Sequence, residues 1–289
     1  MTDYRLRNSR RNQSFFGSMS LTNIIIYINV AVFIIVSLLI GFGIGGNVEG
    51  GDAGIFRYVA LNPELFLGGF IWTLITSMFM HGGLFHLFVN MFSLFFLGDL
   101  VERIIGRKRF LWFYLVTGIA AGLFFVAFAY IGNFVPNGQL LFGDMNDFAV
   151  GASGAIFGLL GIMAILLPKR EVYLIVGPII VIVLQFFLNG LMPSFSGTIN
   201  FIATILVFLM LFSLFSTNKI IKAISMPLRL PFWLAPIIAI VPLVIISFFV
   251  KLPIGNTAHF GGLIVGVAYG FYLRNKYSRK VKMLNRMFA

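Results

Sequence analysis

The chain has 289 residues, of which 60% are hydrophobic and 10% are charged, and its net charge is +12. In soluble domains about a quarter of all residues are charged. This composition therefore excludes a soluble globular protein and indicates a chain folded in lipid. The sequence contains no cysteine. This absence excludes disulfides, thiolate metal sites and cysteine nucleophiles.

Eight apolar stretches are long enough, or nearly so, to cross about 30 Å of hydrocarbon as helices. They cover residues 22–42, 82–102, 110–131, 151–167, 172–192, 199–216, 232–250 and 257–273. A basic segment precedes the first stretch, but its apolar run is too long for a signal peptide, and we interpret it as a retained span. The sequence therefore predicts an all-α polytopic membrane protein.

The basic residues indicate how these spans are oriented. With the N-terminus inside, all of the 21 Lys and Arg residues except Arg57 and Lys251 fall in cytoplasmic loops or tails. This is the positive-inside pattern, so the expected charged partner is the lipid surface and not nucleic acid. We expect cytoplasmic tails at 1–21 and 276–289, a membrane domain at 22–275, and a location in the plasma membrane of a prokaryote.

The outside loop at 43–81 is unusually long. It opens with glycines, which favour turns, and continues into a semi-apolar stretch from Leu65 to Met80. We expect that stretch to lie at the membrane interface, a depth that suits Trp72.

Four polar residues fall at one depth of the predicted bilayer: Ser153, His259, His86 and Asn90. They lie near the outer ends of the fourth, eighth and second spans, all of which run from outside to inside. His86 and Asn90 are four residues apart and therefore share a helix face. Polar side chains inside a membrane are costly and usually functional, so their common depth predicts a joint site.

The residue types in this set are those of nucleophilic catalysis. Ser153 needs a base to attack a carbonyl, and His259 is the candidate. No Asp or Glu lies in the outer part of the three spans, so the sequence predicts a dyad and not a triad. Phe157, one turn below Ser153, could stack on the imidazole, while His86, Asn90 and the Ser153 amide could stabilise an oxyanion.

Glycine strips line the two helices that carry Ser153 and His259. Small residues at this spacing let helices approach closely, as a serine–histidine contact requires, although ordinary helix packing alone would also explain them. We expect structural roles for His81, in the loop before the second span, and for Asp99, at its cytoplasmic end. The strips comprise Gly151, Gly154, Gly158 and Gly161 on one helix and Gly262, Gly266 and Gly270 on the other.

Three motifs resemble the rhomboid intramembrane serine proteases. They are His81-x4-His86-x3-Asn90, Gly151-x-Ser153-Gly154 and Ala258-His259-x2-Gly262-x3-Gly266, and Leu97-Gly98 with Glu102 is also similar to the family pattern. The resemblance implies Ser153 as nucleophile, His259 as general base, and His86 and Asn90 as oxyanion-hole donors. It also implies a six-helix core, transmembrane protein substrates cut near the outer membrane face, and no cofactor.

The sequence departs from the family pattern at two places. The family commonly has Trp-Arg before the second span, where this chain has Trp72-Thr73. A six-helix core also has one helix between the serine and histidine helices, whereas three are predicted here. We therefore interpret 172–216 as an inserted helical hairpin.

Two other functions fit parts of the pattern. A non-proteolytic binding or quality-control protein could share the fold, although such relatives usually lack the serine or the histidine. A transporter would place polar residues along the full depth of the bundle, whereas here they cluster in the outer half.

Overall fold

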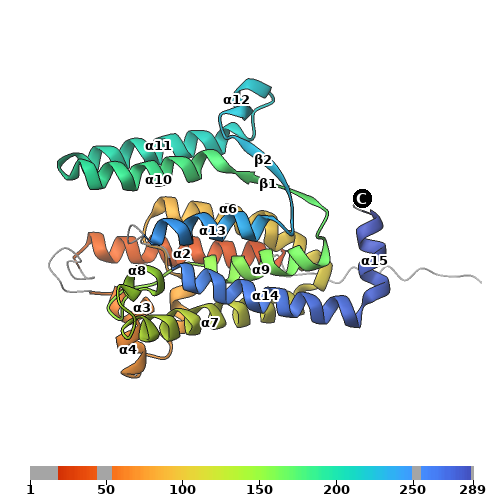
Figure 1. Ribbon diagram of the computed structural model, residues 1–289, viewed down its shortest axis with the longest axis horizontal. Helices are drawn as coiled ribbons and strands as arrows, with labels where there is room; N and C mark the ends of the chain where they lie inside the picture. Colours follow the sequence, from red (N-terminus) through yellow and green to blue (C-terminus); the bar gives the residue numbers. More distant parts are fainter. Residues whose placement is uncertain (1–18, 44–53, 249–254, 288–289) are drawn as a thin grey trace, which may run out of the picture. The chain divides into compact units, whose positions relative to one another are not determined.

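The computed structural model of the protein describes residues 19–43, 54–248 and 255–287. The basic N-terminal residues, most of the glycine-rich opening of the 43–81 loop, and Lys251 lie outside these ranges. Each predicted span contains one long helix, so the all-α polytopic fold is confirmed (Figure 1). These helices are α2 (Leu21–Gly41), α6 (Leu84–Ile105), α7 (Arg107–Gly132), α9 (Ser153–Leu166), α10 (Val176–Leu191), α11 (Ser196–Ser213), α13 (Ala235–Ser247) and α14 (Asn256–Lys276).

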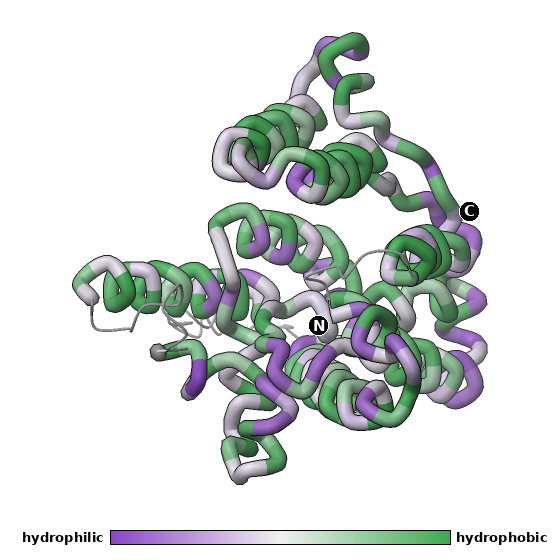
Figure 2. Tube along the Cα trace, turned by 60° about the vertical axis from the view of Figure 1, so that its left-hand side comes forward, coloured by the Kyte–Doolittle hydropathy of each residue, from purple (hydrophilic) through white to green (hydrophobic). Residues whose placement is uncertain are grey.

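The helices are hydrophobic along most of their length (Figure 2). Within the described ranges, four helical segments are long and apolar enough to cross a membrane by themselves. They are Leu21–Gly41, Leu84–Ile105, Arg107–Gly132 and Pro193–Ser213, and α9, α10 and α13 are shorter apolar helices. Large apolar side chains such as Phe187 and Phe201 are exposed on them, as expected for surfaces whose solvent is lipid. The chain is an integral multi-pass membrane protein.

The chain forms two compact units, which are described separately. The first comprises Met1–Leu159 and Pro253–Gly262, and the second comprises Leu160–Leu252 and Leu263–Ala289. The boundaries fall inside α9 and α14, so each of these helices contributes to both units.

Short helices fill the long loop of the first unit. They are α3 (Phe56–Val59), α4 (Pro63–Leu67), α5 (Thr73–Thr76) and the 3₁₀ turn η2 (Ser77–Phe79), and a further short helix, α8 (Gly138–Phe142), follows α7. Leu61 and Ala149 form an isolated antiparallel bridge that joins this loop to the segment before α9.

Trp72 and its neighbours anchor the loop without the arginine that the family resemblance implies. The indole Nε1 of Trp72 donates to the Tyr58 carbonyl at 2.9 Å, and the Thr76 hydroxyl donates to the Val59 carbonyl at 2.8 Å. Thr73, at the position of the expected arginine, is buried, and its hydroxyl donates to the Phe70 carbonyl at 2.6 Å. Both partners of each of these hydrogen bonds lie in the loop, so the loop is held together by its own hydrogen bonds.

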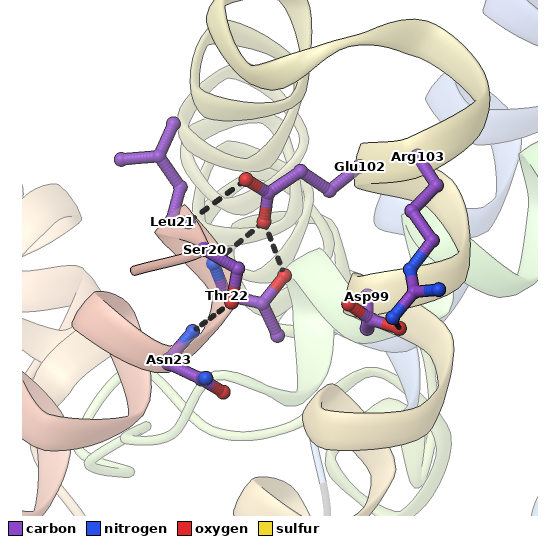
Figure 3. A network of polar contacts seen from close by, with 7 residues as sticks. All are labelled: Ser20, Leu21, Thr22, Asn23, Asp99, Glu102 and Arg103. Atoms are coloured by element: carbon purple, nitrogen blue, oxygen red, sulfur yellow. Dashed lines mark hydrogen bonds and ion pairs between the residues drawn. The ribbon is translucent and has the colours of Figure 1, made fainter. Parts of the chain in front are cut away.

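Glu102, near the end of α6, accepts the backbone N–H groups that open α2 (Figure 3). Its two oxygens lie 2.8 Å from the amides of Leu21 and Thr22, and the Thr22 hydroxyl also donates to Glu102 at 2.8 Å. The first amides of a helix have no partner within the helix, and a carboxylate is the strongest acceptor for them. Asp99, by contrast, pairs with Arg103 at the surface.

The second unit contains a two-stranded ribbon that the sequence analysis did not predict. Strand β1 (Glu171–Ile175) pairs antiparallel with β2 (Pro227–Pro231), with Glu171 opposite Pro231. The prediction that the fifth span begins at residue 172 is therefore wrong by four residues, since α10 begins at Val176. Prolines at both ends of β2 limit further strand pairing.

Helices α10 and α11 run side by side in opposite directions and are joined by the 3₁₀ turn η3 (Pro193–Phe195) (Figure 1). They form the hairpin predicted at 172–216, and α12 (Lys219–Ala223) follows. The segment predicted as a C-terminal tail, 276–289, contains a further helix, α15 (Ser278–Met287). The Asn285 side chain of α15 donates to the Leu166 carbonyl at the end of α9 at 2.8 Å.

Candidate active site

Ser153 is the first residue of α9, and a glycine turn presents it. Gly151 has φ +119, a conformation that side chains rarely adopt, so this position requires glycine. The Gly151 amide donates to the Ser77 carbonyl of the long loop at 2.8 Å. The turn thus fixes the start of the helix, where backbone N–H groups are free and the helix dipole favours negative charge.

His259 lies in the first turn of α14, and its backbone amide donates to the Gly255 carbonyl at 3.0 Å. Its side chain is buried, with 8% of its surface exposed. Nε2 of His259 lies 2.8 Å from the Ser153 hydroxyl oxygen, although the two residues are 106 positions apart in the sequence. That distance is a hydrogen bond. An imidazole so placed can take the serine proton.

Phe157 holds the imidazole from one side. The two rings are stacked, with centroids 4.4 Å apart and planes at 16°. In the described part of the chain, Nδ1 of His259 is buried and has no hydrogen-bond partner. Ring stacking, and not a carboxylate, therefore orients His259 within the described ranges.

Glycines in α9 and α14 bring the two backbones together. A Cβ atom added to Gly262 would collide with the carbonyl of Gly154, and one added to Gly154 would collide with Ala121 of α7. A Cβ on Gly158 would lie 2.7 Å from Thr117 of α7. These positions have no space for a side chain, and the helices approach as closely as a serine–histidine contact requires.

The remaining glycines of the strips are also closely packed. Within the second unit, a Cβ on Gly161 would lie 2.7 Å from the Leu263 carbonyl, and one on Gly270 would lie 2.8 Å from Ile165. Gly266 is buried.

His86 and Asn90 lie against the turn that precedes Ser153. A Cβ on Gly151 would lie 2.8 Å from the His86 ring and 3.8 Å from the Asn90 amide nitrogen. Asn90 is buried, and its Nδ2 donates to the His86 carbonyl one turn earlier at 2.9 Å. The side chains of His86 and Asn90 therefore both lie near the same glycine turn.

His81 lies in the loop before α6, as the sequence analysis expected, and is 2% exposed. Its ring meets His86 edge-on, with centroids 5.2 Å apart. Burial, and then the neighbouring His86, lower the pKa of His81 to about 3, so this ring is neutral at physiological pH. It supports His86 from the side of the loop.

Three residues that contact the site were not predicted from the sequence. The Ser77 carbonyl that receives the Gly151 amide is a backbone group, which any residue could supply. Thr117 and Ala121 of α7 face the glycines of α9. The signal that could have indicated a contact face is the group of small residues within 117–122 in a helix otherwise rich in aromatics, since small residues let helices approach closely.

A comparison with protein families matches the Rhomboid domain at residues 68–210 and 172–276. Together these matches cover more than half of the chain. The chain belongs to the rhomboid family. This assignment agrees with the polar residues of α6, α9 and α14 that the rhomboid resemblance had named, of which Asn90 and His259 are buried and Ser153 and His86 are half-buried.

Several curated rhomboid proteins are similar to parts of the chain. Putative rhomboid protease YdcA of Bacillus subtilis is 35% identical over 100 residues, which are 35% of this chain and 43% of that protein. Rhomboid protease GluP of the same species is 32% identical over 147 residues, 50% of this chain and 25% of that protein. Rhomboid protease AarA of Providencia stuartii is 29% identical over 156 residues, 53% of each chain.

The relatives do not all carry the name of a protease. Inactive RHOMBOID-like protein 8 of Arabidopsis thaliana is 35% identical over 100 residues, 35% of this chain and 24% of that protein. The chain therefore spans at most about half the length of these four curated relatives. Membership of the family supports proteolysis at the level of the family, and the activity of this chain depends on its own site.

Proposed function

We propose that this protein is an intramembrane serine endopeptidase that cuts single-span membrane proteins. The observation that carries the proposal is the 2.8 Å contact between Ser153 and His259, together with the Phe157 ring stacked on the imidazole. A serine hydroxyl has little nucleophilicity unless a base takes its proton. His259 is buried and Ser153 is half-buried among apolar helices, and helix packing alone would not require a polar pair at this place.

The reaction would proceed in two halves. The Ser153 oxygen attacks the scissile carbonyl while its proton passes to Nε2 of His259. The tetrahedral intermediate collapses, the carbon–nitrogen bond breaks, and His259 gives the proton to the leaving amine. A water molecule, deprotonated by His259, then attacks the acyl ester; the carbon–oxygen bond to Ser153 breaks, the acid is released, and His259 returns the proton to the Ser153 oxygen.

Three groups are candidates to bind the developing oxyanion. The Ser153 amide lies at the start of α9, where the helix leaves amides without intrahelical partners. His86 and Asn90 lie near the adjoining Gly151 turn and carry N–H groups. Asn90 Nδ2 donates one N–H to a carbonyl of its own helix, and its second N–H would be the one offered to the substrate.

The membrane orientation is part of the proposal. With both termini in the cytoplasm, the N-terminal ends of α6, α9 and α14 face the outside, and the catalytic pair lies in the outer half of the bilayer. Cleavage would occur near the outer face of a plasma membrane, where water is close.

A non-proteolytic binding role is the alternative that the comparisons raise, since one relative is named inactive. The presence of both Ser153 and His259 at hydrogen-bond distance favours the protease.

The direct test uses purified protein in proteoliposomes with a single-span substrate. We expect the wild type to cut the substrate, and Ser153→Ala and His259→Ala to reduce cleavage to background. The double variant should be no slower than either single variant, because the pair acts as a unit. Undiminished cleavage in both single variants would contradict the proposal.

A further inference from the structure

Helix α15 leaves the end of α14 and runs across its axis (Figure 1). Both α15 and the part of α14 from Leu263 onward belong to the second unit. Tyr277 is the junction, since its amide donates to the Leu273 carbonyl at 2.8 Å and its carbonyl accepts the Val281 amide at 3.0 Å. Because α14 contains the last predicted span, a helix that turns away at its end is placed to lie along the membrane surface.

Within the second unit, one face of α15 is turned toward the protein. Asn285 Nδ2 donates to the Leu166 carbonyl at the end of α9 at 2.8 Å. Val281, Leu284 and Asn285 are half-buried, and they are neighbours on the helix because residues three and four apart share a face. The bond to Leu166 therefore fixes which side of α15 stays exposed.

The opposite side of α15 combines methionine with cations. Met283 and Met287 lie four residues apart and are 58% and 77% exposed. Around an ideal helix, Arg279 and Arg286 lie within about 60° of Met283 on one side. Lys280 lies about 60° from Met283 on the other side, and all three cations are exposed. We call these five residues the exposed face of α15.

The exposed face carries positive charge that no neighbouring carboxylate neutralises. Residues 263–289 contain six Lys or Arg and no Asp or Glu. Within the described ranges, Arg279, Lys280 and Arg286 form no ion pair. One cation close to an anionic lipid surface favours binding by about fivefold. The exposed face therefore distinguishes anionic from zwitterionic lipid.

The end of α14 carries side chains typical of a membrane interface. Tyr272 is half exposed, and Lys276 Nζ donates to its hydroxyl at 2.7 Å. Lys280 Nζ lies 5.9 Å from the centre of the Tyr277 ring. Tyrosine rings gather at the depth of the headgroups, and lysine side chains reach from there toward water and phosphate. The junction thus has the composition expected where α15 would meet headgroups.

We propose that the exposed face of α15 binds the anionic phospholipid headgroups of the leaflet in which α14 ends. With both termini in the cytoplasm, as proposed above, this is the cytoplasmic leaflet. Met283 and Met287 enter the boundary between headgroups and acyl chains, and the flanking cations bind phosphates. A nucleic acid would match the charge but not the methionines, and the start of α15 at the end of a span favours lipid.

This inference goes beyond the general expectation of a lipid surface beside the basic segments. It assigns one helix that inserts into the headgroup region and selects for negative charge. It does not depend on proteolysis, so a failure of the proposed protease leaves it intact.

The first experiment measures lipid contact at Met283 in the full chain. Because the sequence has no cysteine, Met283→Cys carries a single fluorophore, with one copy of the protein in each nanodisc. Spin-labelled phosphatidylglycerol and spin-labelled phosphatidylcholine are compared as quenchers at equal mole fractions. We expect the slope of quenching to be at least about fivefold steeper for the anionic lipid, the effect of one cation. Equal slopes, or no quenching by either lipid, would overturn the inference.

Ser278→Cys is the matched label on another side of the helix. Ser278 is exposed and lies about 140° around the helix from Met283, so we expect weaker quenching there. Equal quenching at both positions would show that α15 does not insert one face and would overturn the inference. Energy transfer between two labelled copies in one disc, without quenching by lipid, would assign the exposed face to self-association and also overturn it.

The second experiment removes the charge. The triple variant Arg279→Gln, Lys280→Gln and Arg286→Gln should lose the preference of the Met283→Cys label for the anionic lipid. The same loss is expected without any variant at 1 M salt, where charges are screened beyond about 3 Å. A full preference in the triple variant or at 1 M salt would contradict the inference. A control that removes three charges from the N-terminal segment should keep the preference: Arg5→Gln, Arg7→Gln and Arg10→Gln.

Discussion

Gly262 of α14 lies so close to the carbonyl of Gly154 in α9 that no side-chain atom fits between the two helices. Helix α9 begins with Ser153, and α14 carries His259 in its first turn. The glycine contact therefore sets the distance across which Ser153 and His259 must bond.

Gly262→Ala should separate the two helices, because the atom in its way is backbone and cannot rotate aside. We expect a loss of about 1–3 kcal/mol in stability from overpacking and a fall in cleavage rate of more than tenfold, measured by thermal unfolding and by substrate cleavage. Gly41→Ala, at the end of α2, is the control, since nothing lies within 4 Å of its added Cβ. Wild-type activity in Gly262→Ala would show that the close approach is not needed.

Phe157→Leu should slow the chemical step by removing the ring stacked on His259. Aromatic pairs contribute about 0.5–1.5 kcal/mol beyond the area they bury, which corresponds to roughly 2- to 13-fold in kcat. KM should stay near its wild-type value, because Phe157 would act through His259 and not on the substrate. Phe157→Tyr preserves the ring and should restore the rate. Equal kcat values for Phe157→Leu and Phe157→Tyr would exclude a role for stacking.

Removal of the candidate oxyanion donors should lower kcat more than it raises KM. Each of His86→Ala and Asn90→Ala is expected to cost about 10²–10³ in kcat, as for other oxyanion donors. Steady-state kinetics on the wild type and the two variants measure this. Asn133→Ala, which changes an exposed amide after α7, is the control and should leave kcat unchanged. A change in KM alone would assign the two residues to substrate binding.

Glu102→Gln should destabilise the protein without touching the catalytic pair. The amide keeps the size of the side chain but replaces one acceptor with a donor, which would face an N–H group of α2. Loss of a buried, charge-assisted acceptor costs about 1–3 kcal/mol, visible as a lower Tm in detergent. Asp99→Asn breaks an ion pair whose carboxylate is 38% exposed and should change stability by less than about 1 kcal/mol. Equal shifts in the two variants would contradict this role of Glu102.

The sequence was sufficient to predict the eight helices because each apolar stretch can be recognised by its own length, and the basic residues in the loops mark where one stretch ends and the next begins. It was also sufficient to predict the contact of Ser153 with His259, because the chain has three histidines and His259 is the one that opens the last span, at the depth of Ser153. These inferences depend on local composition and on depth, which do not require knowledge of packing.

The β1–β2 ribbon could not be predicted in the same way. Its strands are separated by the whole α10–α11 hairpin, and the apolar residues of β1 continue directly into α10, so periodicity gives no boundary there. The contact of Ser77 with Gly151 was equally inaccessible, since it uses a backbone carbonyl. The role of Glu102 was missed because a charge near the cytoplasmic end of a span is usually explained by the interface.

The central claim is that His259 activates Ser153, and labelling by a serine-directed fluorophosphonate measures this most directly. The probe reacts with an activated serine and requires no knowledge of the natural substrate. We predict that Ser153 is labelled in the wild type, that Ser153→Ala abolishes the signal, and that His259→Ala slows labelling by at least about 100-fold. Labelling of His259→Ala at the wild-type rate would contradict this claim. So would labelling of Ser153→Ala, at another residue, to the same extent as the wild type.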